Sequence, residues 1–152
     1  MPRLLLFAPF QRVLVDRNDN TISFIQLLEG FEAPLADLPA QQLAEGVTIP
    51  MAWGSCAVWL QQPEDEGRRY EQRVSVVRPD GVVALEAQVE FAMTLRTQRN
   101  TARIDGFPAS PAGEFWLKLE LRGVEPATEW ELAAEYPVSM AHKSAQDNPA
   151  AD

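Results

Sequence analysis

The sequence predicts an all-β protein, an antiparallel β-sandwich of seven to eight strands with one short helix. Three observations lead to this fold class: apolar residues alternate with polar ones over several segments, turn-forming residues separate those segments, and almost no segment has helical periodicity. A chain of 152 residues can bury one sizeable core without disulfides. We therefore expect one β-sandwich domain over residues 1–140 and a small, polar, disordered tail over 141–152.

Residues 4–16 and 21–31 form the first expected hairpin. The polar cluster DRNDN at 16–20 joins them, and its Asp and Asn residues favour turns and tolerate left-handed backbone conformations. Pro9 lies within the first of these strands and has no backbone N–H to donate. We expect the strand to bend or to switch sheets at that point.

Residues 37–46, DLPAQQLAEG, form the only predicted helix, which is one or two turns long. Asp37 is the expected N-cap, Pro39 lies in the first turn and Gly46 ends the helix. The next segment, VTIPMAWGSCAVWLQQ at 47–62, has apolar residues at both alternating positions. This pattern predicts a central strand that is covered on both faces.

The clearest alternation predicts a long strand with one buried face. It is preceded by RPDG at 78–81, a typical turn sequence, so RYEQRVSVV and VVALEAQVEFAMTLR should pair as a second hairpin. The apolar residues of the alternating run are Leu85, Ala87, Val89, Phe91, Met93 and Leu95.

A third hairpin is expected near the C-terminus. Residues 115–122 and 130–138 both alternate, and residues 123–128 connect them. Before this hairpin, residues 99–113 should begin extended and end in a Pro/Gly-rich loop. Pro137 places the last strand at the edge of a sheet.

The charge balance limits the classes of partner. The chain has 13 basic and 22 acidic residues and a formal net charge of −9, so we expect binding to neither nucleic acid nor an anionic membrane. No apolar run approaches the roughly 18 residues that a transmembrane helix needs. The first residues lead directly into a strand-like segment, and the single cysteine allows no internal disulfide. These features favour a cytoplasmic location.

Groups that carry catalysis are scarce. The single histidine, His142, falls in the expected tail, so no serine or cysteine has an evident base. Cys56 lies in the sequence GSC, which lacks the spacing of a nucleophile elbow, and should be a buried apolar residue. Acidic pairs such as Glu86 and Glu90 should keep a strand face hydrated. We expect no enzymatic activity and no cofactor.

One segment partly matches a calcium-binding loop. Asp16, Asn18 and Asn20 have the spacing of the first three ligands, but Thr21 and Leu27 replace the glycine and the bidentate glutamate that the motif requires. We therefore interpret the segment as a hairpin turn and expect no metal site. The alternative is a shallow calcium site built from several loops; its candidate ligands are Asp16, Asp19, Asp80 and Asp105.

Of the four tryptophans, Trp53 and Trp59 lie in the strand that is expected to be covered on both faces, and the other two are assigned to strand faces by their parity. Trp130 shares its parity with Leu132 and Tyr136 and should lie in the core, whereas Trp116 falls on the polar face of its strand. An exposed tryptophan is a typical interface anchor, so we expect a subunit or partner contact there, with its own loops or tail as the alternative cover. The expected interface residues are Trp116, Lys118, Glu120 and Arg122.

Arginines gather in a second region. Arg96, Arg99 and Arg103 lie in a stretch without acidic residues, and together they form a candidate patch for an anionic partner. The neighbouring hairpin adds four more arginines. Acidic residues at 64–66 and 71 offer the alternative of a solvated, ion-paired face.

Three segments resemble an uncharacterised bacterial family of small proteins: APFQRVLVDRNDNTISFIQLLEGF at 8–31, FPASPAGEFWLKLEL at 107–121 and AAEYPVSM at 133–140. The resemblance covers roughly residues 4–140 and rests on hydrophobic patterns and turn residues. It implies a small β-sandwich of unknown function and assigns no catalytic or binding residue.

These observations favour a non-enzymatic protein–protein interaction or assembly module, bound to a second copy of the chain or to another protein. The alternative, from a different functional class, is a β-sandwich that binds a carbohydrate or calcium. Thermal shifts with calcium and simple glycans would distinguish the two, because a ligand that binds only the native state raises the melting temperature.

Overall fold

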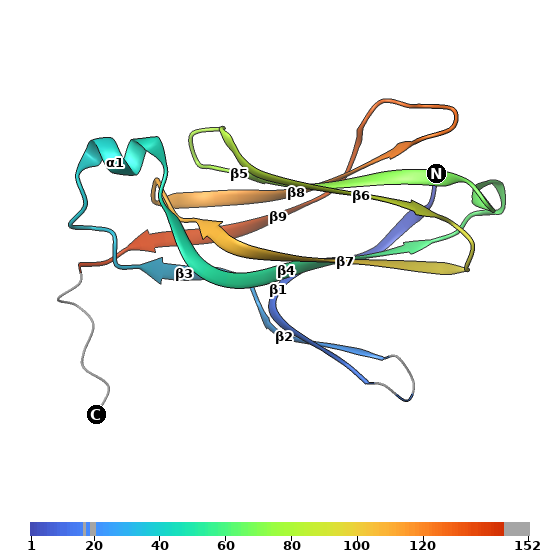
Figure 1. Cartoon of the computed structure of the whole chain (residues 1–152), viewed down its shortest axis with the longest axis horizontal. Helices are drawn as coiled ribbons and strands as arrows, with labels where there is room; N and C mark the ends of the chain where they lie inside the picture. The colour runs from blue at the N-terminus through green and yellow to red at the C-terminus, as the bar shows by residue number, and fades with distance from the viewer. Residues whose placement is uncertain (17, 19–20, 145–152) are drawn as a thin grey trace.

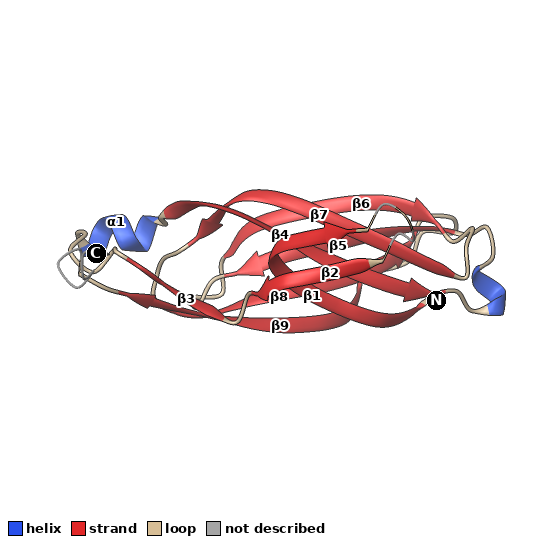
Figure 2. Ribbon diagram, turned by 90° about the horizontal axis from the view of Figure 1, so that it is seen from below, coloured by secondary structure: helices blue, strands red, loops and turns tan. Residues whose placement is uncertain are grey.

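The computed structural model describes residues 1–16, 18 and 21–144. Within this part the chain is all-β, with nine strands in two sheets, one short α-helix, α1 (Ala40–Glu45), and one turn of 3-10 helix, η1 (Pro63–Asp65) (Figure 1). The two helices lie at opposite ends of the molecule (Figure 2). The strands are β1 (Arg3–Val15), β2 (Ile22–Leu27), β3 (Gly30–Ala33), β4 (Thr48–Leu60), β5 (Arg69–Val77), β6 (Val83–Ala92), β7 (Thr97–Pro108), β8 (Gly113–Gly123) and β9 (Glu131–His142).

Sheet A has four antiparallel strands in the order β2-β1-β4-β7. Its central strand β4 is buried on both faces from Trp53 to Ala57, which confirms the prediction for this segment. The hairpin of β1 and β2 is also confirmed. After Pro9, β1 stays in sheet A but changes its neighbour at Phe10, from β4 to β2, so the strand does not switch sheets.

Sheet B has five strands in the order β3-β9-β8-β5-β6 and contains the other two predicted hairpins, β5–β6 and β8–β9. One pair is parallel: Gly30–Ala33 of β3 runs beside Ser139–His142 of β9. The prediction that the last strand lies at an edge is therefore wrong, because β9 has β3 on one side along Ser139–His142 and β8 on the other. Pro137 itself lies just outside the segment that β3 pairs with, where its missing N–H leaves no ladder bond unmade.

The predicted core position of Trp130 is also wrong. Leu119 pairs with Ala134 but Glu120 pairs with Leu132, so β9 contains one extra residue at this point. Such a bulge reverses the alternation of all residues beyond it. Leu132 is consequently 55% exposed, and Trp130 lies on the outer face of sheet B.

The long alternating strand is shorter and more exposed than predicted. β6 ends at Ala92 and forms the edge of sheet B. Phe91 and Met93 are buried as expected, but Val89 and Leu95 are 44% and 64% exposed. An edge strand has a neighbour on one side only, so part of its apolar stripe stays in contact with water.

The predicted helix exists, but its N-cap differs. Pro39 occupies the N-cap position without a side-chain cap, and Asp37 instead accepts a hydrogen bond from Ser144. Gly46 ends the helix at φ 111°, as expected, because glycine adopts positive φ without steric penalty.

The two sheets share a core that is mostly apolar and is crossed by one polar network. Gln72 of sheet B accepts hydrogen bonds through Oε1 from Trp59 Nε1 at 2.8 Å and from Asn100 Nδ2 at 3.1 Å, both of sheet A. All three side chains are buried. The network therefore ties β5 to β4 and β7 across the space between the sheets.

The C-terminal boundary lies beyond the expected one. Ala141 and His142 belong to β9, and the His142 ring hydrogen-bonds through Nε2 with the carbonyl of Ala109 at 2.7 Å. Lys143 continues this edge through backbone hydrogen bonds with Ala33 and Ala36. The rest of the expected tail, 145–152, lies outside the described residues.

Candidate functional site

The four residues of the expected interface lie together on the outer face of β8, and each charged one has a partner within the chain. Lys118 Nζ is 3.1 Å from Glu135, and Glu120 is 2.7 Å from Arg73. Arg122 is 2.6 Å from Glu71. Trp116 is half-buried.

Trp130 completes this surface, which sequence reasoning did not anticipate. The guanidinium carbons of Arg73 and Arg122 lie 4.3 Å and 4.5 Å from its ring centroid. Cations at this distance are attracted by the aromatic ring. The bulge in β9 was the missing signal, because it moves Trp130 onto the same face as the two arginines.

On the outer face of sheet B, every basic residue of the strands is paired with an acidic residue of the same sheet. The strands of sheet B hold eight acidic and four basic residues, a formal charge of −4, and each of the four basic residues has an acidic partner. A face with paired charges gains little from a charged partner, because the existing pairs must first be broken.

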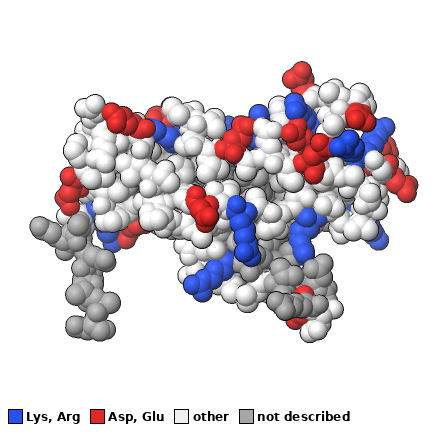
Figure 3. Space-filling model, in the orientation of Figure 1, with Lys and Arg blue, Asp and Glu red and all other residues white. Residues whose placement is uncertain are grey.

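The outer face of sheet A is different in charge. Its strands contain Arg3, Arg12, Arg99 and Arg103 with a single acidic residue, Asp105, a formal charge of +3. In Figure 3, basic side chains lie across the lower middle of the molecule, where Figure 1 draws β1, β4 and β7, while acidic side chains gather mainly along the upper edge and the ends.

The predicted arginine patch belongs to this face. Arg99 and Arg103 are cross-strand neighbours of Val58 and Gly54, which alternate along β4 with core residues such as Ala57, and Arg96 immediately precedes β7. Within the part of the chain that the structure describes, Arg96 and Arg103 form no ion pair, nor do Arg3 and Arg12. Sequence reasoning missed the last two because they lie on β1, which only the strand order brings into the same sheet as β7, with β4 between them.

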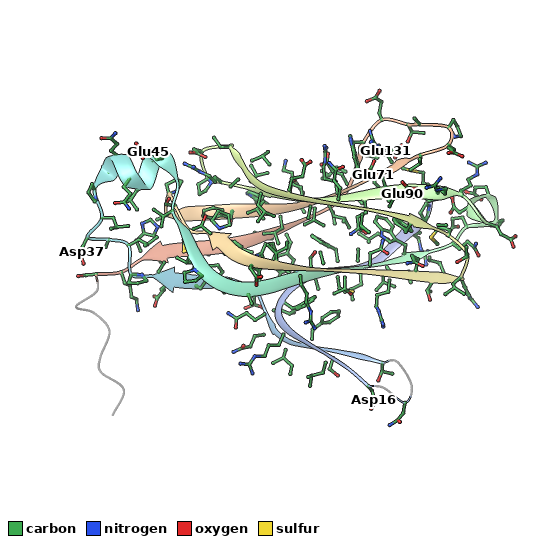
Figure 4. All side chains as sticks on the ribbon, in the orientation of Figure 1. Asp16, Asp37, Glu45, Glu71, Glu90 and Glu131 are labelled. Carbon is green, nitrogen blue, oxygen red and sulfur yellow. The ribbon has the colours of Figure 1, made fainter. Side chains whose placement is uncertain are left out.

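Exposed leucine and isoleucine side chains accompany these arginines. They belong to β1 and β2, whose hairpin leaves the body of the molecule as an arm that ends near Asp16 (Figures 1 and 4). An isolated two-stranded hairpin is only marginally stable in water. The exposed side chains, with their exposed fractions, are Leu5 (48%), Leu6 (39%), Leu14 (59%), Ile25 (38%) and Leu27 (47%).

A groove lies at the fork where the arm leaves the sheet. β1 pairs with β4 only as far as Gly54, so Thr48–Trp53 of β4 pairs with β7 alone. The groove has a volume of about 470 Å³. Phe10, Arg12, Leu14, Trp53, Arg103 and Asp105 line it.

The candidate calcium ligands are far apart. Asp16 lies at the end of the arm, where its Oδ1 accepts a hydrogen bond from the Asn18 backbone N–H at 2.7 Å, while Asp80 lies in the β5–β6 turn and Asp105 in β7. Asp19 lies outside the described residues. Among the residues that are described, no group of three or more His, Cys, Asp or Glu is arranged to hold a metal ion.

The cysteine and the two glutamates considered for catalysis are either buried or engaged in ion pairs. Cys56 is fully buried, and this burial raises the pKa of its thiol above the ordinary value. Glu86 and Glu90 form ion pairs with Arg73 and Arg69 on the outer face of sheet B.

Comparison of the chain with protein-family models and with curated proteins found no match. The resemblance to a bacterial family stays a prediction. No helix in the described part of the chain has the length and apolar character needed to cross a membrane.

Proposed function

We propose that this protein is a non-enzymatic β-sandwich that serves as an assembly module and binds another polypeptide on the outer face of sheet A. The sandwich assignment is supported by the core shared between the two sheets and by the Gln72 network that crosses it. The parallel β3–β9 pair is an addition to the antiparallel arrangement.

One observation carries the proposal: exposed aliphatic side chains occupy the same sheet face as arginines that form no ion pair with any described residue. Leu6 and Leu27 are 39% and 47% exposed, and Arg12 of the arm and Arg103 of β7 line the same groove. Protein interfaces combine buried apolar contacts with arginines that bind acidic groups. We therefore favour this face over the one around Trp116, whose charges are already paired.

The non-enzymatic part of the proposal is supported by the environment of the reactive groups. Cys56 is enclosed by β1 and β7, and the acidic residues of sheet B neutralise neighbouring arginines. A cytoplasmic location also stays a proposal, which rests on composition alone.

The test compares two leucines with similar exposure on opposite sheets. The tagged protein is produced at its natural level in cells of its source, as wild type, as Leu27→Glu and as Leu132→Glu. The size of the complex that contains it is then measured by sedimentation of the cell extract. We expect the wild type and Leu132→Glu in a complex larger than one chain and Leu27→Glu as a single chain, because a buried unpaired carboxylate opposes binding.

A wild type that sediments as a single chain, or a complex that is lost only with Leu132→Glu, would contradict the proposal. Circular dichroism of both variants is the folding control, since exposed leucines contribute little to stability.

Carbohydrate binding is the second candidate function, and one pocket favours it. An open pocket of about 570 Å³ beside Trp116 is lined by Arg78, Lys118 and Glu135. Arg78 Nε is buried and has no hydrogen-bond partner among the described residues, although its Nη2 contacts Asp80 and Ala44. A saturable change in tryptophan fluorescence with simple glycans, lost in Trp116→Ala, would support this function; no change would exclude it for those glycans.

A further inference from the structure

We propose that the groove at the fork between the arm and β4 binds an acidic polypeptide segment in extended conformation, with Arg12 and Arg103 holding its carboxylates. This inference rests on the proposed function, because it names the chemistry of the partner on the same face. It goes further by specifying a site, a conformation and a charge.

β4 has an edge without a strand partner where β1 leaves it. From Gly54 to Leu60, β4 lies between β1 and β7. From Thr48 to Trp53, it pairs only with β7. Every second residue of a strand directs its backbone N–H and C=O toward one side, so this stretch presents hydrogen-bonding groups where β1 has left, except at Pro50, which has no N–H, and at the register shift between Ile49 and Ala52. An added extended segment can form main-chain hydrogen bonds there, as in other cases of strand addition.

Two arginines from different strands line the groove. Arg12 comes from the arm and Arg103 from β7, so they reach the groove from two of its walls. Both are exposed, and neither forms an ion pair with the described residues. Guanidinium groups bind carboxylates through paired, charge-assisted hydrogen bonds.

The remaining walls explain why the partner is a polypeptide. Leu14, which is 59% exposed, and the half-buried Ile104 give the groove apolar surface that alternate side chains of an extended segment can cover, while the buried Phe10 and Trp53 lie beneath it. Nucleic acids and anionic membranes carry extended negative charge, which the net charge of −9 repels beyond the groove itself. A short acidic segment meets mainly the local positive charge, because salt screens interactions beyond about 8–10 Å.

Asp105 reduces the positive charge of the groove. It lines the same groove and is the single acidic residue in the strands of sheet A. Its carboxylate repels an acidic segment, so removing its charge should strengthen binding. Asp105 thus provides a variant whose effect has the opposite sign to that of the arginine variants.

The experiment measures the affinity of the full chain for a fluorescent peptide of about eight residues in which Glu and Val alternate. We expect saturable binding that Arg12→Gln and Arg103→Gln each weaken about tenfold and that Asp105→Asn strengthens about twofold. The matched control is Arg69→Gln, which removes an exposed, ion-paired arginine from sheet B and should leave the affinity unchanged.

Three further probes test the class of partner. A peptide with Gln in place of Glu and a peptide with alternate N-methylated amides should both bind at least about tenfold more weakly, because the first lacks charge and the second lacks ladder donors. Oligothymidylate and vesicles of phosphatidylserine and phosphatidylcholine should bind more weakly than the acidic peptide at 0.15 M salt.

Equal binding of the Glu and Gln peptides, tighter binding of the oligonucleotide or vesicles, or no effect of the Arg12 and Arg103 variants would each overturn the inference. Absence of peptide binding would do the same. The proposed function survives these results if sedimentation still shows a complex that Leu27→Glu abolishes; if that complex is also absent, both fail.

Discussion

At the residue scale, buried polar side chains decide where the two sheets meet. Asp65 is fully buried and accepts a hydrogen bond from the Tyr70 hydroxyl at 2.5 Å. Gln72 accepts from Trp59 and Asn100. Sequence reasoning did not identify these contacts, because a glutamine or an aspartate on a strand looks like a solvent-facing residue until its partners are known.

Replacing Gln72 by Leu should lower the free energy of unfolding by about 2–4 kcal/mol, since it leaves two buried donors without an acceptor. The control, Gln88→Leu, changes an exposed residue of β6 and should have an effect within about 0.5 kcal/mol. Urea unfolding of both variants measures the difference. Equal effects would show that the network does not join the sheets.

The Tyr70 hydroxyl should make the free energy of unfolding fall as the pH rises in the alkaline range. Burial, followed by the hydrogen bond and the negative charge of Asp65, raises the pKa of Tyr70 well above its ordinary value of 10.0. A raised pKa in the folded state means that the stabilisation is complete below pH 10 and is lost as the pH rises above it. Tyr70→Phe should therefore lose less stability than the wild type between pH 9.5 and 11 in urea unfolding; parallel losses would contradict this cause.

At the scale of elements, local pairing could be predicted and non-local pairing could not. The turns at 78–81 and 123–128 identified their hairpins because a turn sequence lies between the two strands it joins. The parallel β3–β9 pair joins residues more than a hundred positions apart, and no local signal marks it. The bulge opposite Leu119 and Glu120 was equally invisible, and it reversed the predicted face of Trp130.

The position of Trp130 on the outer face of sheet B can be tested by the stability cost of truncating its side chain. Trp130→Ala should cost about 0.5–2 kcal/mol, because the ring lies half-buried over Arg73 and Arg122. A core tryptophan would cost about 3–5 kcal/mol when truncated. A double-mutant cycle with Arg73→Gln should give a coupling free energy of about 0.5–1 kcal/mol; a coupling near zero would remove the stacking interaction from the account.

Gly54 has no side chain, and this lets β1 and β7 pack closely against β4 at the fork. A Cβ at this position would lie 2.4 Å from the Ala102 carbonyl oxygen and 2.9 Å from the Phe10 ring. Gly54→Ala should therefore lower the free energy of unfolding by about 1–3 kcal/mol, as overpacking does. A neutral variant, measured by thermal unfolding, would mean that β1 and β7 approach β4 less closely than the structure shows.

At the scale of the whole molecule, the two outer faces differ in how their charges are satisfied. Net charge could be read from the sequence, but its division into a basic sheet A and an acidic sheet B depends on strand order. Arg96, Arg99 and Arg103 were predicted as a group because they are close in the chain. Arg12 joins Arg103 only through the fold, because the arm brings it to the groove.

The central claim is that the outer face of sheet A, and not that of sheet B, is the binding surface. Its most direct test places a photo-reactive amino acid at Leu27 or at Leu132, two leucines of similar exposure on opposite sheets, and irradiates living cells of the source. We predict a discrete cross-linked polypeptide, identified by mass spectrometry, from position 27 and none from position 132. Cross-linking from position 132 alone, or from neither position, would contradict the claim.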